Sequence, residues 1–150
     1  MPLKVAIIYN DPQPDRYGAM GESKAELGVL EEVKAVSDAL EELKYDYSLI
    51  ALKPPLSKVK RVLQSIKADV VFNLFEGFDG SPETEGRIAA MLTALKLPFS
   101  GCPASALDLA LDKARTKQLL SAAGIKTPQY QILTPSNIET FRLTFPCLVK

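Results

Sequence analysis

Short apolar runs alternate with amphipathic helical stretches over the first two thirds of this chain. The runs of strand length are residues 3–9, 45–52 and 70–74. The helical stripes between them include Val29, Val33 and Leu40, and then Val59 and Leu63. The first run is continuously apolar, as in a central parallel strand that is buried on both faces. This alternation predicts an α/β fold with a doubly wound parallel sheet, whose ligands bind beyond the carboxyl ends of the strands.

The pattern continues with a helix over residues 83–95 and a short strand over residues 98–100. It changes after residue 112, where the remaining runs, residues 130–133 and 146–150, are too short and too late to extend the same sheet. We therefore predict a first domain over residues 1–112 and the beginning of a second subdomain over residues 113–150, with strands at those two late runs.

The composition excludes several classes of function. Lys plus Arg equals Asp plus Glu, at 18 each, so no basic excess indicates a nucleic-acid or membrane partner. No histidine is present, which excludes histidine triads, histidine metal sites and a histidine general base. Two cysteines without metal-ligand spacing are typical of buried small hydrophobes, and with no export signal they favour the cytoplasm.

An acidic loop follows the third apolar run. It begins with Glu76 and Gly77 and contains four carboxylates in total. Acidic groups that complement a helix N-terminus would account for Glu83 and Glu85. They account less well for Glu76, which falls at the carboxyl end of a strand, where a carboxylate can pair with the ammonium group of a ligand.

Two lysines, Lys113 and Lys117, lie one helical turn apart and share a face of the predicted helix. They suit a phosphate, but a solvated basic stripe has the same pattern. The same two interpretations apply to Lys150, which follows an apolar run.

Several segments together resemble the N-terminal part of the D-alanine–D-alanine ligases, enzymes of the ATP-grasp superfamily. The segments with the most specific order and spacing are Ala104-Ser105-Ala106-Leu107, Leu111-Asp112-Lys113, Thr116-Lys117, Ala123-Gly124-Ile125, Thr127-Pro128 and Phe145-Pro146-Cys147-Leu148-Val149-Lys150. Residues 68–74 and 85–101 are similar to the third strand of the family and to its following helix, strand and turn. The resemblance implies a Rossmann-like pre-ATP-grasp domain followed by the start of an ATP-grasp subdomain.

The resemblance also implies a reaction and roles for particular residues. ATP activates an amino acid carboxylate as an acylphosphate, and the amine of a second amino acid attacks it to form a dipeptide for the cell wall. In this chain Lys113 and Lys150 occupy the positions that hold ATP. Glu76 is the candidate catalytic residue, and Glu26, Glu76 and Gly77 are the candidate substrate-binding residues. The Mg²⁺ ligands of the family lie outside this sequence, and a homodimer is the assembly that the family implies.

The sequence departs from the family at two places. Glu76-Gly77 stands where the family carries a histidine-glycine pair, which leaves the identity of the amino acid open. Gly21-Glu22-Ser23 and Glu26 only approximate the glycine pair and Ser/Glu/Ser cluster of the family, so another N-terminal glutamate is an alternative to Glu26. We expect no ligase activity from the 150 residues alone, and a non-enzymatic ligand-binding or subunit-interaction domain is the alternative function.

Overall fold

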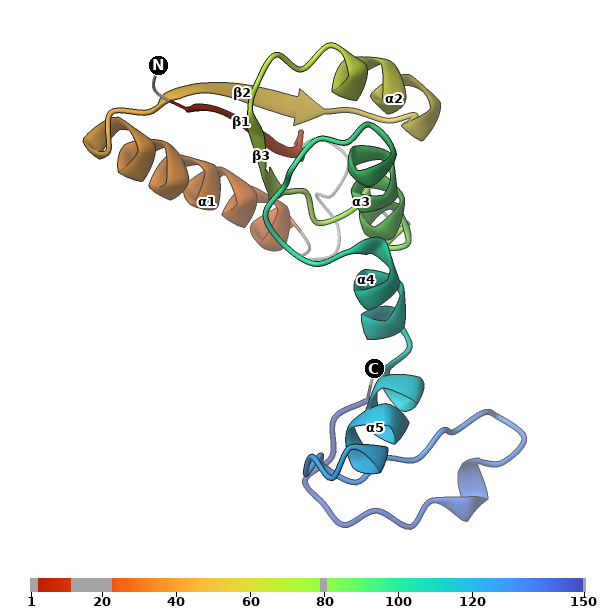
Figure 1. The fold of residues 1–150 in the computed structure, drawn as a ribbon. Coiled ribbons are helices and arrows are strands. Elements are labelled where there is room, and N and C mark those ends of the chain that lie inside the picture. Colours follow the sequence, from red (N-terminus) through yellow and green to blue (C-terminus); the bar gives the residue numbers. More distant parts are fainter. Residues whose placement is uncertain (1–2, 12–22, 79–80, 150) are drawn as a thin grey trace. The chain divides into compact units, whose positions relative to one another are not determined.

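Three strands form a parallel sheet in the computed structural model, which describes residues 3–11, 23–78 and 81–149, with the backbone alone at 23–27 (Figure 1). The strands are β1 (Lys4–Asn10), β2 (Asp46–Leu52) and β3 (Val70–Leu74), in the order β2-β1-β3. The central β1 pairs in parallel with both neighbours, so that Ile7 lies opposite Leu49 on one side and Phe72 on the other. Each connection contains a helix, as parallel pairing of neighbouring strands requires.

Helices cover both faces of this sheet. Alternate residues of β1 point to opposite faces, and Ala6 and Ile8 face the helices α2 (Leu56–Gln64) and α3 (Thr84–Ala94). The core on that side consists of Ala6, Ile8, Leu52, Val59, Leu63, Val71, Phe75, Ile88 and Leu92. The long helix α1 (Ser23–Glu42) lies along the other face, where Val5 and Ile7 are also buried (Figure 1). The predicted doubly wound parallel α/β fold is therefore confirmed.

The predicted strand at residues 98–100 is reduced to one parallel bridge beside β3. The Val71 N–H donates to the Pro98 carbonyl over 2.8 Å, and the Ser100 N–H donates to the Val71 carbonyl over 3.0 Å. A strand was therefore wrong as a description, although the segment does lie at the expected edge of the sheet. The chain turns away at once through Gly101, whose φ of +100° is a conformation that glycine tolerates best.

Contacts divide the chain into two compact units, Met1–Asp108 and Leu109–Lys150. The helix α4 (Ala104–Leu111) crosses this division, and α5 (Lys113–Ala122) follows it directly. Besides these helices, the described part of the second unit contains one short 3₁₀ helix, η2 (Ile138–Thr140), and irregular chain. A domain boundary between residues 112 and 113 stays a prediction.

The two late strands predicted at residues 130–133 and 146–150 were wrong for every residue of them that the structure describes. A strand is stabilised only by pairing, and residues 130–133 and 146–149 have no partner strand within the described part of the chain. Instead, the Gln131 side chain donates to the Thr140 carbonyl over 2.7 Å and accepts from the Arg142 N–H over 2.9 Å. Of the helices in the described ranges, none is both long and apolar enough to cross a bilayer.

Candidate functional site at the carboxyl edge of the sheet

Asn10 joins the carboxyl ends of two neighbouring strands. It is the last residue of β1, it is 8% exposed, and its Oδ1 accepts a hydrogen bond from the Glu76 N–H over 3.3 Å. A polar side chain at the end of an otherwise apolar strand must find a partner when it is buried. By binding the backbone of the loop after β3, Asn10 holds Glu76 beside the end of β1.

The segment after residue 98 is fastened to the same edge. The Asn73 N–H donates to Ser100 Oγ over 3.0 Å, and Asn73 Oδ1 in turn accepts from the Phe75 N–H over 3.2 Å. The carboxyl ends of β1 and β3 and the turn that begins at Ser100 therefore lie together, which is where ligands bind in open parallel sheets.

Thr84 fixes the loop that carries Glu76 and Gly77. Its buried Oγ1 accepts from the Phe78 N–H over 2.8 Å and donates to the Ser81 carbonyl over 2.6 Å. Gly77 has a φ of +104°, which places the loop in a conformation unfavourable for other residues. The loop is thus held at both ends, by Asn10 and by Thr84.

Aromatic packing supports this loop from the core side. The rings of Phe75 and Phe78 meet edge to face, with centroids 4.9 Å apart and an interplanar angle of 85°. Phe75 is buried and belongs to the core, so the contact ties the loop to the body of the domain.

The Glu76 carboxylate is exposed, and its electrostatic surroundings disfavour its charge. Partial burial raises the pKa of Glu76 above its ordinary value, and the negative charge of Glu32 on α1 raises the pKa further. Both effects make the charged form of Glu76 less stable, and a bound cation would stabilise that form. An ammonium ion bound there would reverse the shift, because an opposite charge favours the ionised form.

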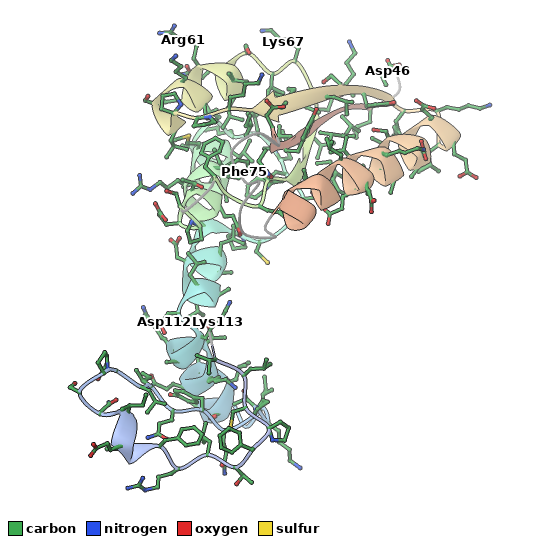
Figure 2. The ribbon with its side chains drawn as sticks, turned by 180° about the vertical axis from the view of Figure 1, so that it is seen from behind. Asp46, Arg61, Lys67, Phe75, Asp112 and Lys113 are labelled. Carbon is green, nitrogen blue, oxygen red and sulfur yellow. The ribbon has the colours of Figure 1, made fainter. Side chains whose placement is uncertain are left out.

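In the second unit, the side chains at the start of α5 are engaged with the protein itself. Asp112 Oδ1 accepts from the Arg115 N–H over 2.9 Å and so caps α5. Lys113 Nζ donates to the Ala110 carbonyl at the end of α4. Figure 2 labels Asp112 and Lys113 where the two helices meet.

Lys117 has a different set of contacts from Lys113. Its Nζ donates to Thr127 Oγ1 over 3.0 Å and to the Pro128 carbonyl over 2.8 Å, and it lies 5.8 Å from the centroid of the Tyr130 ring. These contacts fasten the chain that follows α5 to the helix. Lys117 is therefore not a solvent-exposed lysine of a basic stripe.

The structure brings some of the predicted site residues together and leaves others undescribed. Glu76 and Gly77 lie at the carboxyl edge of the sheet, in the first unit, and Lys113 lies in the second unit. Glu26 is within α1, but its side chain is outside the described residues, and so is Lys150. The assigned roles of all five residues stay predictions.

Sequence reasoning missed three residues that shape this site. Asn10 and Thr84 hold the loop, and Glu32, which is exposed on α1, raises the pKa of Glu76. The sequence did contain a signal for Asn10, because a polar residue at the end of a buried apolar strand needs a hydrogen-bond partner. No comparable signal marks Thr84 or Glu32, since their roles depend on how the loop and α1 meet the sheet.

Two other features of the described residues are not candidate sites. A shallow hollow of about 310 Å³ lies at the opposite, amino edge of the sheet, and the residues that line it include Asp46 and Lys67, which Figure 2 labels. Its remaining lining residues are Lys4, Val5, Tyr47 and Ser48. No cluster of three or more potential metal-ligating side chains is found in the part of the chain that the structure describes.

The parallel sheet with helices on both faces defines a Rossmann-like α/β domain. Solved structures with the same fold are known. The chain aligns with the D-alanine–D-alanine ligase of Bacillus anthracis with a TM-score of 0.60 and 21% identity, over 95% of this chain and 40% of that one. For the D-alanine–D-alanine ligase of Aeromonas hydrophila the TM-score is 0.60 and the identity 23%, over 91% and 52%. At these identities the likeness shows the fold alone.

Sequence comparison gives the more specific relation. The chain is 33% identical over 133 residues to the D-alanine–D-alanine ligase of Methylobacterium radiotolerans, which is 87% of this chain and 41% of that protein. It is 44% identical over 69 residues to the enzyme of Hydrogenovibrio crunogenus, covering 44% of this chain and 22% of that one. No protein-family model matches the chain. The resemblance to the D-alanine–D-alanine ligases is confirmed, and the chain spans less than half of the length of these relatives, as an N-terminal part of such an enzyme would.

Proposed function

We propose that this chain is the N-terminal part of an ATP-dependent carboxylate–amine ligase of the D-alanine–D-alanine ligase type. In this proposal residues 1–112 bind the first amino acid, and residues 113–150 begin the ATP-binding subdomain. The observation that carries it is the similarity to one such ligase over 133 residues, which extends through both units of the chain. The parent protein would act in the cytoplasm in the synthesis of a cell-wall dipeptide, possibly as a homodimer, with ATP and an amino acid as its small-molecule partners.

The chemistry requires one activated carboxylate and one free amine. ATP supplies the phosphoryl group that converts the first carboxylate to an acylphosphate, and the second amino acid closes the peptide bond. Mg²⁺ would neutralise phosphate charge, through ligands beyond this chain. The residues of this chain bind and orient the reactants.

Glu76 is the residue that we propose to bind the ammonium group of the first amino acid. Its position beyond β3, held by Asn10 through the backbone, puts a carboxylate at the edge where ligands of parallel sheets bind. The raised pKa of Glu76 agrees with a group that lacks its cationic partner. Gly77 lets the loop turn close to the ligand, and Glu26 would add a second carboxylate from α1.

Lys113 and Lys150 are the residues that we propose to contact ATP. A lysine ammonium suits phosphate oxygens as a compact point charge. Lys113 is exposed at the first position of α5, so its long side chain can exchange the Ala110 carbonyl for another acceptor. Half of a nucleotide pocket neither excludes water nor positions two substrates, and the 150-residue chain should therefore have no ligase activity by itself.

Ligand binding to the 150-residue chain tests the amino-acid half of the proposal. D-Alanine should perturb NMR signals of the loop around Glu76, and Glu76→Gln should weaken this binding about tenfold or more, because a charge-assisted contact is lost. Glu83→Gln is the matched control, since Glu83 is exposed at the start of α3 and its side chain makes no cap. Equal affinities of the two variants would contradict the assignment of Glu76.

Nucleotide binding tests the other half in the same chain. Lys113→Ala should weaken ATP binding about tenfold to a hundredfold, the range of a hydrogen bond to a charged group. A phosphate-release assay with ATP, magnesium and D-alanine should read blank. Turnover in that assay would show that the active site is more complete than we propose.

A non-enzymatic ligand-binding or subunit-interaction domain remains the second candidate, and one observation favours it. Large apolar side chains of the second unit are exposed, among them Phe145 at 78%, Leu148 at 91% and Val149 at 97%. Such a surface is typical of one that another polypeptide covers. A subunit-interaction domain predicts binding of neither ATP nor D-alanine, so the two titrations above distinguish it from the ligase.

A further inference from the structure

The break between α4 and α5 is not explained by the helix-forming tendency of the sequence. Residues 104–122 contain neither glycine nor proline, and most of them are good helix formers. Even so, α4 ends at Leu111 and α5 begins at Lys113, with Asp112 between them at φ −86° and ψ 88°. A ψ of 88° is far from helical values, so one residue interrupts what the sequence would otherwise continue.

Side chains bond backbone groups on both sides of this break, and the Leu109 carbonyl also accepts from the Asp112 N–H over 3.1 Å. Asp112 Oδ1 accepts from the Arg115 N–H over 2.9 Å, at the start of α5. Thr116 Oγ1 donates to the Leu109 carbonyl over 2.7 Å, and Lys113 Nζ donates to the Ala110 carbonyl, both at the end of α4. Each helix end is therefore capped by side chains from the other side of the break or from the break itself.

The position of the Lys113 ammonium has a second effect. It lies at the C-terminal end of α4, where the helix dipole presents partial negative charge and favours a cation. Any anion that draws Lys113 away removes both the hydrogen bond to Ala110 and this favourable charge. The Ala110 carbonyl then regains a partner within the protein if the Ala114 N–H reaches it, which is the hydrogen bond of a continuous helix.

We propose that Asp112 is a hinge between α4 and α5, and that the side chains of Asp112, Lys113 and Thr116 stabilise the break between these two helices. Phosphate binding by Lys113 shifts the equilibrium toward one continuous helix. The phosphate response rests on the proposed function, whereas the side-chain hinge does not. The hinge lies in the second unit, four residues beyond Asp108, the last residue of the first unit.

Backbone amide hydrogen exchange reads the state of the hinge directly. In a continuous helix the amides of Lys113 and Ala114 would bond the Leu109 and Ala110 carbonyls. The double variant Asp112→Ala/Thr116→Val should therefore slow exchange at both amides by about threefold to tenfold, the effect of one net hydrogen bond. Unchanged exchange at both amides would overturn the hinge and leave the proposed function untouched.

Lys113→Met tests the lysine separately, with Lys117→Met as its control. Loss of the Lys113 ammonium should slow exchange at the Ala114 amide, by less than the double variant does. Lys117 binds Thr127 and Pro128 and not α4, so its replacement should leave that amide unchanged. Equal effects of the two lysine variants would show that Lys113 has no special part in the break.

Spin labels give a second measure that does not depend on exchange. Labels at the exposed residues Ser105 and Gln118, in a chain whose two cysteines are replaced by serine, should approach about 20 Å along the axis of one continuous helix, from 13 residues at 1.5 Å each. The double variant should sharpen the distance distribution toward that value. A distribution identical to that of the parent chain would contradict the hinge.

Added Mg·ATP tests the phosphate response. The nucleotide should slow exchange at the Ala114 amide in the parent chain and have no effect in Lys113→Met. If the double variant behaves as expected but the nucleotide changes nothing, the hinge stands and its phosphate response fails. The ATP titration of Lys113→Ala then decides separately on the nucleotide half of the proposed function.

Discussion

Replacement of Thr84 by valine should loosen the loop that carries Glu76 without changing the volume of the side chain. Thr84 is 5% exposed, and its Oγ1 makes two hydrogen bonds, from the Phe78 N–H and to the Ser81 carbonyl. Valine leaves both backbone groups without this partner. At about 1 kcal/mol for each net hydrogen bond, Thr84→Val should lower the free energy of unfolding by about 2 kcal/mol.

Urea unfolding of the 150-residue chain, followed by circular dichroism, measures this loss. With a slope of about 2 kcal/mol per molar urea, the midpoint should fall by roughly 1 M. Thr93→Val is the matched control on the same helix, because Thr93 is exposed and its hydroxyl only bonds back to the Ala89 carbonyl over 2.9 Å. If the two variants lose the same stability, the reasoning that Thr84 fixes the loop is refuted.

Three further substitutions test the packing and the charge of the first unit. A Cβ on Gly86 would lie 2.2 Å from Asp108 Oδ1, so Gly86→Ala should lower the free energy of unfolding in urea by about 1 kcal/mol. In an Asp108→Ala background the same substitution should raise it by about 0.5 kcal/mol, because alanine favours a helix more than glycine does. Partial burial raises the pKa of Glu76, so the folded chain binds the Glu76 proton more tightly than the unfolded chain does. Glu76→Gln should therefore increase stability at pH 7, and this gain should vanish as the pH falls below about 4. Urea midpoints measured across this pH range would show it. Leu63→Ala should cost about 2–5 kcal/mol because Leu63 is fully buried, whereas Val62→Ala, at an exposed neighbour, should cost less than about 1 kcal/mol.

The fold of the first unit could be predicted because its signals are local and agree with one another. The continuous apolar run of β1 indicated a strand buried on both faces, and β1 is the central strand with buried residues facing both layers of helices. The spacing of Val59 and Leu63 likewise placed both residues in the core. Local pattern and tertiary packing therefore dictate the same structure here.

The site could be predicted only as a region. The rule that ligands bind beyond the carboxyl ends of parallel strands led to Glu76, since that rule needs only the order of the elements. The contacts that hold the loop, from Asn10 and Thr84, join residues 66 and 6 positions away from their partners, and no sequence periodicity encodes them. The effect of Glu32 on Glu76 likewise depends on where α1 lies against the sheet.

The two strands predicted in the second unit were wrong for a physical reason. Its apolar runs have the composition of strands, yet no described residue of 109–149 is buried, and the extended segments there have no partner strand within the described chain. Burial of apolar surface is the main free energy that offsets the loss of chain entropy, so the described residues of the second unit gain less stability from burial than those of the first. The composition of residues 130–133 and 146–149 therefore does not decide their structure alone, because a strand also needs a neighbouring strand to pair with.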